Sequence, residues 1–162
     1  MELVNIVDES GNNTGQIVDR KTVQDSSLLH WEVVIFLIND MGQMLLEMRS
    51  PNKRFNPNKW APCAGGVVAG ENLFDAALRE LEEELGIEVL EEDLNVLEEN
   101  DNLTRFYYVF CNKKEEEFII QKEELSCVKW YDISEVIEMI KNRDSITIKE
   151  DKLYLLERLN AL

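Results

Sequence analysis

The chain has 162 residues, with 33 acidic and 17 basic side chains, a formal net charge of −16 and 44% hydrophobic residues. This is enough apolar material for one domain with a proper core, and residues 1–162 are expected to form a single domain. The negative charge, which no basic stripe offsets, argues against binding of a nucleic-acid polymer through its phosphates.

The ends and the cysteines of the chain predict where the protein resides. The N-terminal residues M-E-L-V-N-I-V-D contain neither a basic region nor an apolar run, so no signal peptide is expected. No apolar stretch approaches the roughly 20 residues of a membrane-spanning helix. Cys63, Cys111 and Cys127 lack metal-binding or redox spacing and are interpreted as reduced thiols. The sequence therefore predicts a cytoplasmic protein with no membrane partner.

The first half of the chain is expected to form strands. Alternating apolar residues predict a strand at 3–7, and the turn-rich stretch E-S-G-N-N-T-G leads to a second strand at 16–19. A small N-terminal β-hairpin over about residues 1–24 follows from this pattern. The strongest strand is W-E-V-V-I-F-L-I at 31–38, and the turn N-D-M-G connects it to a strand at 44–49. Because the first of these two runs is almost continuously apolar, both of its faces are expected to be covered.

The second half alternates helices with strands. Helices are expected over residues 73–85, 134–142 and 150–160, and strands over residues 94–98, 104–111 and 127–131. Strands flanked by helices in this way predict an α/β fold, an α/β/α sandwich around a mixed β-sheet.

The helix expected at 73–85 carries an acidic stripe beside an apolar one. On a wheel of about 100° per residue, Glu80, Glu83 and Glu84 fall within roughly 100° of one another. Leu81 and Leu85 lie on the adjacent arc, so the acidic stripe borders the core. Clustered carboxylates repel one another unless a cation lies between them, and hard oxygen ligands suit Mg²⁺, Mn²⁺ or Ca²⁺. The helix therefore predicts a divalent-metal site, and Mg²⁺ in particular favours phosphate substrates.

Residues 65–87 read G-G-V-V-A-G-E-N-L-F-D-A-A-L-R-E-L-E-E-E-L-G-I. They match the pattern G-x5-E-x7-R-E-U-x-E-E-x-G-U, with U aliphatic, at every fixed position, and the chain thereby resembles the Nudix family. The segment R-S-P-N-K-R-F-N-P-N-K-W is similar to the branch containing isopentenyl-diphosphate isomerases and their hydrolase relatives. The resemblance implies the family's α/β/α fold. It also implies hydrolysis of a small-molecule diphosphate linkage with Mg²⁺, or alternatively Mn²⁺, as cofactor.

The resemblance assigns roles to individual residues. Glu80, Glu83 and Glu84 would bind the metal together with the carbonyl group of Ala64. The candidates for the catalytic base that takes a proton from the attacking water are Glu83, Glu84 and Glu124. The residues expected to support the site structurally are Gly65, Glu71, Arg79 and Gly86.

A basic loop precedes the Nudix box. Its four cations, interpreted either as phosphate contacts or as an ordinary exposed loop, are Arg49, Lys53, Arg54 and Lys59. Several aromatic side chains could stack on a substrate, although most are expected in the core. These are Trp31, Phe55, Trp60, Phe106 and Tyr108.

Two alternatives to a hydrolase follow from the same resemblance. Isomerases of this branch use a reactive cysteine before the box and a histidine-rich metal site. Here Ala64 takes the cysteine's place, Cys63 is one residue away, and His30 is the only histidine. A non-catalytic binding module would have lost box carboxylates, which this chain retains.

The preferred interpretation is a hydrolase of a nucleoside diphosphate linked to another moiety. The substrate and the oligomeric state stay open, although homodimers are common in the family.

Overall fold

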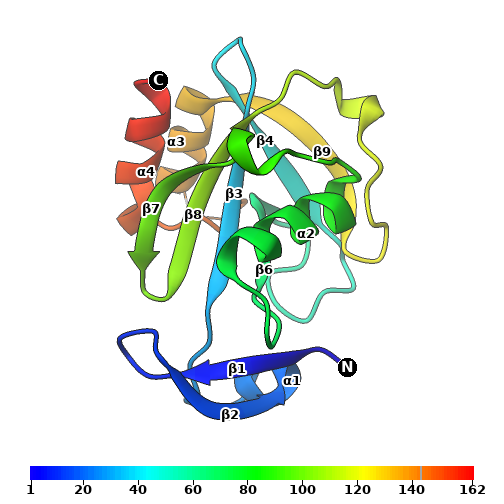
Figure 1. Ribbon diagram of the computed structural model, residues 1–162. Coiled ribbons are helices and arrows are strands. Elements are labelled where there is room, and N and C mark those ends of the chain that lie inside the picture. Colours follow the sequence, from blue (N-terminus) through cyan, green and yellow to red (C-terminus); the bar gives the residue numbers. More distant parts are fainter. Residues whose placement is uncertain (143) are drawn as a thin grey trace.

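A mixed β-sheet lies at the centre of the molecule, with helices on both of its faces (Figure 1). The computed structural model describes residues 1–142 and 144–162. The strands of the sheet are β3 (Glu32–Ile38), β4 (Gln43–Arg49), β5 (Trp60–Ala61), β6 (Cys63–Gly66), β7 (Asn95–Asp101), β8 (Thr104–Phe110) and β9 (Leu125–Asp132). Helix α2 (Leu73–Leu85) covers one face, and α3 (Ile133–Asn142) and α4 (Leu153–Asn160) cover the other. The α/β/α sandwich predicted from the sequence is therefore confirmed.

Strand β3 organises the sheet. It pairs in parallel with β8 from Glu32 to Ile38, and β8 pairs antiparallel with β7. Strand β4 pairs antiparallel with β9 and β5. Strands β3 and β4 share only the pair Ile38↔Met44, and toward its other end β3 pairs with β6 instead. The two strands therefore separate from each other along their length, which leaves room for a cleft between them.

The two faces of β3 enter two different cores. Val33, Ile35 and Leu37 pack in the cluster that includes Leu81 and Leu85 of α2. The intervening residues belong to the opposite cluster, formed with α3 and α4, whose members from β3 are Phe36 and Ile38. Because side chains alternate along a strand, a continuous apolar run is buried only when both faces are covered. The predicted coverage of both faces is thus observed.

The N-terminal hairpin forms a separate two-stranded sheet of β1 (Leu3–Val7) and β2 (Asn13–Asp19), followed by the short helix α1 (Arg20–Gln24). It has a small core of its own, formed by Val4, Ile6 and Val23. The Ala69 amide donates a hydrogen bond of 2.8 Å to the Leu3 carbonyl, so the hairpin is attached to the loop that precedes α2. The predicted hairpin is present, although its second strand begins three residues earlier than expected.

Other differences from the predicted elements are local. The C-terminal helix divides into a 3-10 turn, η3 (Glu150–Lys152), and α4. The segments that the sequence did not indicate are α1, β5, β6 and the 3-10 turns η1 (Glu91–Asp93) and η2 (Glu115–Glu117). Strand β6 contains two glycines and has little intrinsic strand preference, so its conformation depends on pairing with β3. Among the described residues, no helix is both long and apolar enough to cross a membrane.

Candidate metal and phosphate site

Helix α2 presents the carboxylates of the Nudix box. It begins after Asn72, whose side chain accepts a 2.8 Å hydrogen bond from the Asp75 amide, and it ends at Gly86 in the left-handed conformation with φ of 66°. The buried side chains of its apolar stripe fix the rotation of the helix against the sheet. As a result Glu80 and Glu84 are buried, with 7% and 9% exposure, whereas the Glu83 side chain is 51% exposed.

Arg79 connects the loop before α2 to the acidic face of the helix. Its guanidinium donates hydrogen bonds of 2.8 and 2.9 Å to the two carboxylate oxygens of Glu71, and another of 2.9 Å to the Gly66 carbonyl. It also donates to Glu80 at 2.8 Å and to Glu83 at 3.2 Å. Hydrogen bonding to Glu71 raises the pKa of Arg79, so the residue stays a cation. This arrangement fits the supporting role expected for Glu71 and Arg79.

Gly65 allows the close approach of strand β6 to α2. A Cβ atom at this position would overlap the carboxylate of Glu80, so no other residue fits without displacing that side chain. The neighbouring Ala64 amide donates a 3.3 Å hydrogen bond to Glu84 Oε1. Gly65 and Ala64 therefore bring the backbone directly against the two buried carboxylates.

The buried carboxylates hold protons more tightly than carboxylates in water. Burial raises the pKa of Glu84 to about 8, and the charge of Glu80 adds to this effect. Burial also raises the pKa of Glu80 to about 7, although Arg79 opposes the shift. A divalent cation would compensate for this desolvation and mutual repulsion. The donor set consists mainly of carboxylate oxygens, so these residues fit the Mg²⁺ or Mn²⁺ that the sequence predicts.

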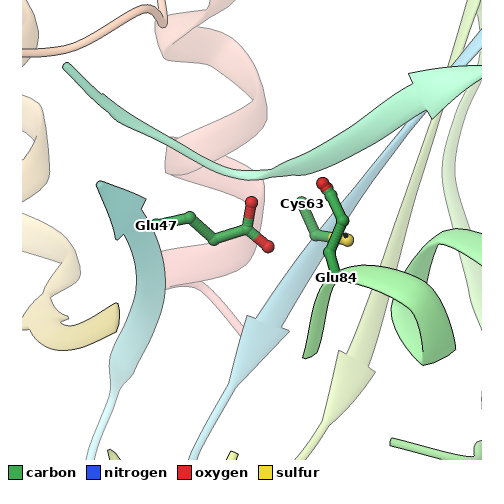
Figure 2. A group of neighbouring side chains, drawn as sticks. All are labelled: Glu47, Cys63 and Glu84. Atoms are coloured by element: carbon green, nitrogen blue, oxygen red, sulfur yellow. Dashed lines mark hydrogen bonds between the residues drawn. The ribbon is translucent and has the colours of Figure 1, made fainter. Parts of the chain in front are cut away.

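Glu47 of β4 is a further carboxylate at this site that the sequence did not indicate. Figure 2 shows it beside Cys63 of β6 and Glu84 of α2, and one ligand atom from each of the three lies within 4.8 Å of the others. Burial and the charge of Glu84 raise the pKa of Glu47 well above its ordinary value. The only sequence signal for this residue is a lone glutamate in the apolar strand M-L-L-E-M.

Two adjacent clefts open next to the carboxylates. The first, here called the acidic cleft, has a volume of about 320 Å³ and is lined by Gly65, Glu80, Glu83 and Glu84 together with basic side chains. The second, called the aromatic cleft, measures about 560 Å³ and extends between β3 and β4. The residues that line both clefts are Arg20, Gln24, Arg49, Phe55, Ala64, Glu84 and Glu124. The two clefts are therefore adjacent, with Glu84 in their shared wall.

The basic loop residues have different surroundings. Arg49 donates hydrogen bonds to the carbonyl groups of Phe55 and Asn56, so it shapes the loop while it lines both clefts. Lys53 forms an ion pair with Glu124 in the acidic cleft. Arg54 forms an exposed ion pair with Asp25 at 2.6 Å and also lines that cleft. Lys59 is not among the described residues that line either cleft.

Arg20 was missed by the sequence analysis because it belongs to the N-terminal hairpin, far from the box in sequence. It lines both clefts, and its Nε atom is buried without a hydrogen-bond partner among the described residues. Its guanidinium also lies beside Gly66 and donates a 3.3 Å hydrogen bond to Glu2. Arg20 is thus an available donor at the wall of the site.

The candidate aromatic residues divide between the clefts and the core. Phe55 is 44% exposed and lines both clefts. Phe106 is buried, stacks on Phe36 with ring centroids 6.0 Å apart, and forms part of the aromatic cleft. Trp31 donates a hydrogen bond to the Gly11 carbonyl, Trp60 packs on Tyr131, and Tyr108 packs on Phe110.

The molecule is an α/β/α sandwich in which the helix after a glycine loop presents carboxylates to a partly basic cleft. This is the architecture of a Nudix protein. Comparison with protein families supports this assignment, because residues 28–152 match the family model of the NUDIX domain. The chain belongs to the Nudix family.

Individual relatives agree with the family assignment. YfcD of Escherichia coli K12, named an uncharacterized Nudix hydrolase, is 33% identical over 138 residues, which cover 83% of this chain and 76% of that protein. Isopentenyl-diphosphate Delta-isomerase 2 of Photorhabdus laumondii is 26% identical over 152 residues, covering 90% and 85% of the two chains. An uncharacterized Nudix hydrolase of Yersinia pestis is 42% identical over 88 residues, and the match spans 54% of this chain and about half (48%) of that relative.

A solved structure shows the same fold along the whole chain. The crystal structure of DR0079 from Deinococcus radiodurans superimposes with a TM-score of 0.77 at 23% identity, covering 98% of this chain and 99% of that one. The N-terminal hairpin is therefore included in the similarity of fold.

Proposed function

We propose that the protein hydrolyses a diphosphate linkage in a small molecule, with Mg²⁺ as its cofactor and Mn²⁺ as an alternative. The observation that carries this proposal is the position of three box glutamates in one cleft, beside four basic side chains. These lining residues are Glu80, Glu83, Glu84, Arg20, Arg49, Lys53 and Arg54. Negative ligands next to cationic donors suit a bound metal ion and the phosphate groups that it would contact.

Glu80, Glu83 and Glu84, together with the Ala64 carbonyl, would hold the ion. When bound, Mg²⁺ neutralises charge that develops on the phosphate groups and lowers the pKa of an attacking water. Arg79 orients Glu80 and Glu83 through direct hydrogen bonds, so the carboxylates are positioned before any ligand arrives.

The remaining roles fall to residues at the walls of the two clefts. Glu83, Glu84 and Glu124 are the candidate bases for the proton of the attacking water, and all three line the acidic cleft. Arg20, Arg49 and Lys53 would contact the phosphate oxygens, since all three line the acidic cleft. The organic part of the substrate would occupy the aromatic cleft, against Phe55 and Phe106.

We further propose that the substrate is a nucleoside diphosphate linked to another moiety. The aromatic cleft supports this class, because at about 560 Å³ it has both aromatic and hydrogen-bonding walls. A solved structure of the same fold, the NUDIX domain of Shewanella oneidensis NrtR at a TM-score of 0.58 and 21% identity, is a complex with ADP ribose. That compound belongs in the substrate panel.

An isomerase of isopentenyl diphosphate is the second candidate, because a relative that matches 90% of the chain carries that name. The residues of this chain at the site offer less support for an isomerase than for a hydrolase. The residue that lines both clefts just before the box is Ala64, whereas Cys63 is buried and contacts Glu84. The single histidine, His30, places its Nδ1 atom 3.0 Å from the Trp31 carbonyl.

One substrate screen tests both candidates. The protein would be incubated with Mg²⁺ and ADP ribose, nucleoside di- and triphosphates, nucleotide sugars, dinucleotides and isopentenyl diphosphate, with chromatography of the products. Mg²⁺-dependent release of a monophosphate is the expected result. Formation of dimethylallyl diphosphate would instead establish the isomerase, and Mg²⁺ binding without turnover of any compound would indicate a binding module.

A further inference from the structure

Glu47 is a carboxylate outside the Nudix box that lies deep in the same site. It is 3% exposed, and it extends from β4 toward Cys63 and Glu84 (Figure 2). Its neighbours along the strand, Leu45 and Leu46, are buried in the two apolar cores. An ionisable side chain in this position has a high desolvation cost unless a partner compensates for it.

The described part of the protein offers Glu47 no cationic partner, and its polar neighbours are the Cys63 thiol and the Glu84 carboxylate. Glu47 Oε1 is buried and has no hydrogen-bond partner there, and no ion pair of Glu47 is formed with a described lysine or arginine. Helix α2 has one guanidinium, that of Arg79, and it is hydrogen-bonded to Glu71, Glu80 and Glu83. Native proteins rarely leave a buried carboxylate oxygen unpaired, so the orphaned oxygen indicates a missing ligand.

The chemistry of the cluster favours a hard divalent cation. Ligands that share one ion at about 2.0–2.6 Å lie within roughly 4–5 Å of one another, and the three atoms of this cluster lie within 4.8 Å. Two carboxylates neutralise one divalent charge, which a buried site requires. The Cys63 thiol donates to Glu84 at 3.6 Å and adds no charge while it remains protonated.

We propose that Glu47 and Glu84 together bind a divalent cation, Mg²⁺ or Mn²⁺, on the sheet side of α2. Glu84 would then be shared between this ion and the ion held by the box carboxylates, and the four carboxylates would together balance the charge of two divalent ions. These four are Glu47, Glu80, Glu83 and Glu84. Both Glu47 and Glu84 line the aromatic cleft and Glu84 also lines the acidic cleft, so the ion would lie close to where the two clefts meet. The inference rests on the proposed function in one respect, namely that Glu84 is a metal ligand.

The test counts Mn²⁺ ions without substrate, by electron paramagnetic resonance of free Mn²⁺ and by calorimetry. Glu47→Gln is expected to bind one Mn²⁺ fewer per chain than the wild type and to show a smaller rise of the thermal midpoint with Mn²⁺. Glu82→Gln removes a carboxylate from the exposed side of the same helix, and it should bind as many ions as the wild type.

Equal stoichiometry in the wild type and Glu47→Gln would overturn the inference. Glu84→Gln distinguishes this failure from failure of the proposed function. If Glu84→Gln loses ions and Glu47→Gln does not, Glu47 alone is wrongly assigned; if neither variant loses an ion, the metal site of the proposed function is wrong as well. Should Glu47→Gln fail to fold, Glu47→Asp is measured, and it is expected to weaken binding of one ion by about 10-fold or more.

Discussion

At the scale of single residues, Glu84 lies in the wall that the two clefts share. It accepts hydrogen bonds from the Ala64 amide and the Cys63 thiol, and it lines both clefts. Glu83, one residue earlier, is half exposed and bonded to Arg79. The two glutamates thus have different surroundings on the same helix, although the family pattern treats them alike.

We expect Glu83→Gln and Glu84→Gln each to lower kcat by about 10²-fold or more. Each substitution removes a negative charge proposed to bind the metal ion directly, and with it about 3 kcal/mol of transition-state stabilisation. Steady-state rates at saturating Mg²⁺, on the substrate found in the screen, provide the measurement. Glu82→Gln, on the exposed side of the helix, should retain the wild-type rate. Near-normal rates in both box variants would show that the metal ligands are assigned incorrectly.

The raised pKa of Glu84 predicts how stability depends on pH without metal. In the folded state burial raises the pKa to about 8 from an ordinary 4.5, so between these values the folded state binds more protons than the unfolded state. Protonation of Glu84 therefore makes its full contribution to the free energy of unfolding below about pH 4.5. This contribution is lost as the pH rises through about 8. The free energy of unfolding of the wild type should therefore fall relative to that of Glu84→Gln across this window.

Urea denaturation of both proteins in a chelator, at several pH values from 4.5 to 8.5, measures this difference. Saturating Mg²⁺ should remove most of the decline in the wild type, because a bound cation stabilises the ionised carboxylate. A difference between the two proteins that stays constant over the pH range would contradict the effect of burial on Glu84.

At the scale of elements, the site depends on how the end of β6 and the loop at residues 67–72 are attached to α2. Arg79 makes that attachment through a planar guanidinium that bonds both oxygens of Glu71 and the Gly66 carbonyl. Both side chains of the ion pair are largely buried, with 23% exposure for Arg79 and 13% for Glu71. A lysine keeps the charge but cannot form the same set of directed bonds.

Arg79→Lys is therefore expected to lower the free energy of unfolding by about 1–3 kcal/mol, since charge-assisted hydrogen bonds are lost in a partly buried position. It should also weaken Mg²⁺ binding, because Glu80 and Glu83 lose their orienting donor. Chemical denaturation and calorimetry give the two values. Arg54→Lys is the matched control, since its ion pair with Asp25 is about 60% exposed on both sides and should contribute little. A stability change as small as that of the control would mean that Arg79 does not anchor the loop.

Comparison of particular elements shows what the sequence predicts and what it does not. Helix α2 lies at its expected bounds because a capping Asn72, an apolar stripe and a terminal Gly86 agree locally. Strand β6 was missed, since glycine has no strand preference and only pairing with β3 fixes the segment. The position of Glu47 depends on the face of β4 that meets α2, which no local pattern reveals. The box residues were therefore predictable from their spacing, whereas the clefts require tertiary structure.

At the scale of the whole molecule, the charge is distributed unevenly. The chain has a net charge of −16, yet four cations from three segments converge on the acidic cleft. Arg20 comes from α1, Arg49 from β4, and Lys53 and Arg54 from the loop that follows. An anionic substrate of the proposed kind would be repelled by the molecule as a whole, so its affinity would come from these local donors and from bound metal. The N-terminal region supplies one of them, Arg20, and thus forms part of the wall of the cleft.

Arg20→Gln tests whether the hairpin contributes to substrate binding. The substitution removes one charged donor from both clefts, and a charge-assisted hydrogen bond of about 1.5–3 kcal/mol corresponds to a rise in KM of roughly 10-fold or more. We expect kcat to change far less than KM, because Arg20 lies outside the set of metal ligands. Thermal stability should also change little.

Lys21→Gln changes the same charge on the exposed side of α1 and should leave KM unaltered. An unchanged KM in Arg20→Gln would restrict the hairpin to a structural role, whereas equal losses in kcat and Tm would indicate that Arg20 acts through folding rather than through contact with phosphate.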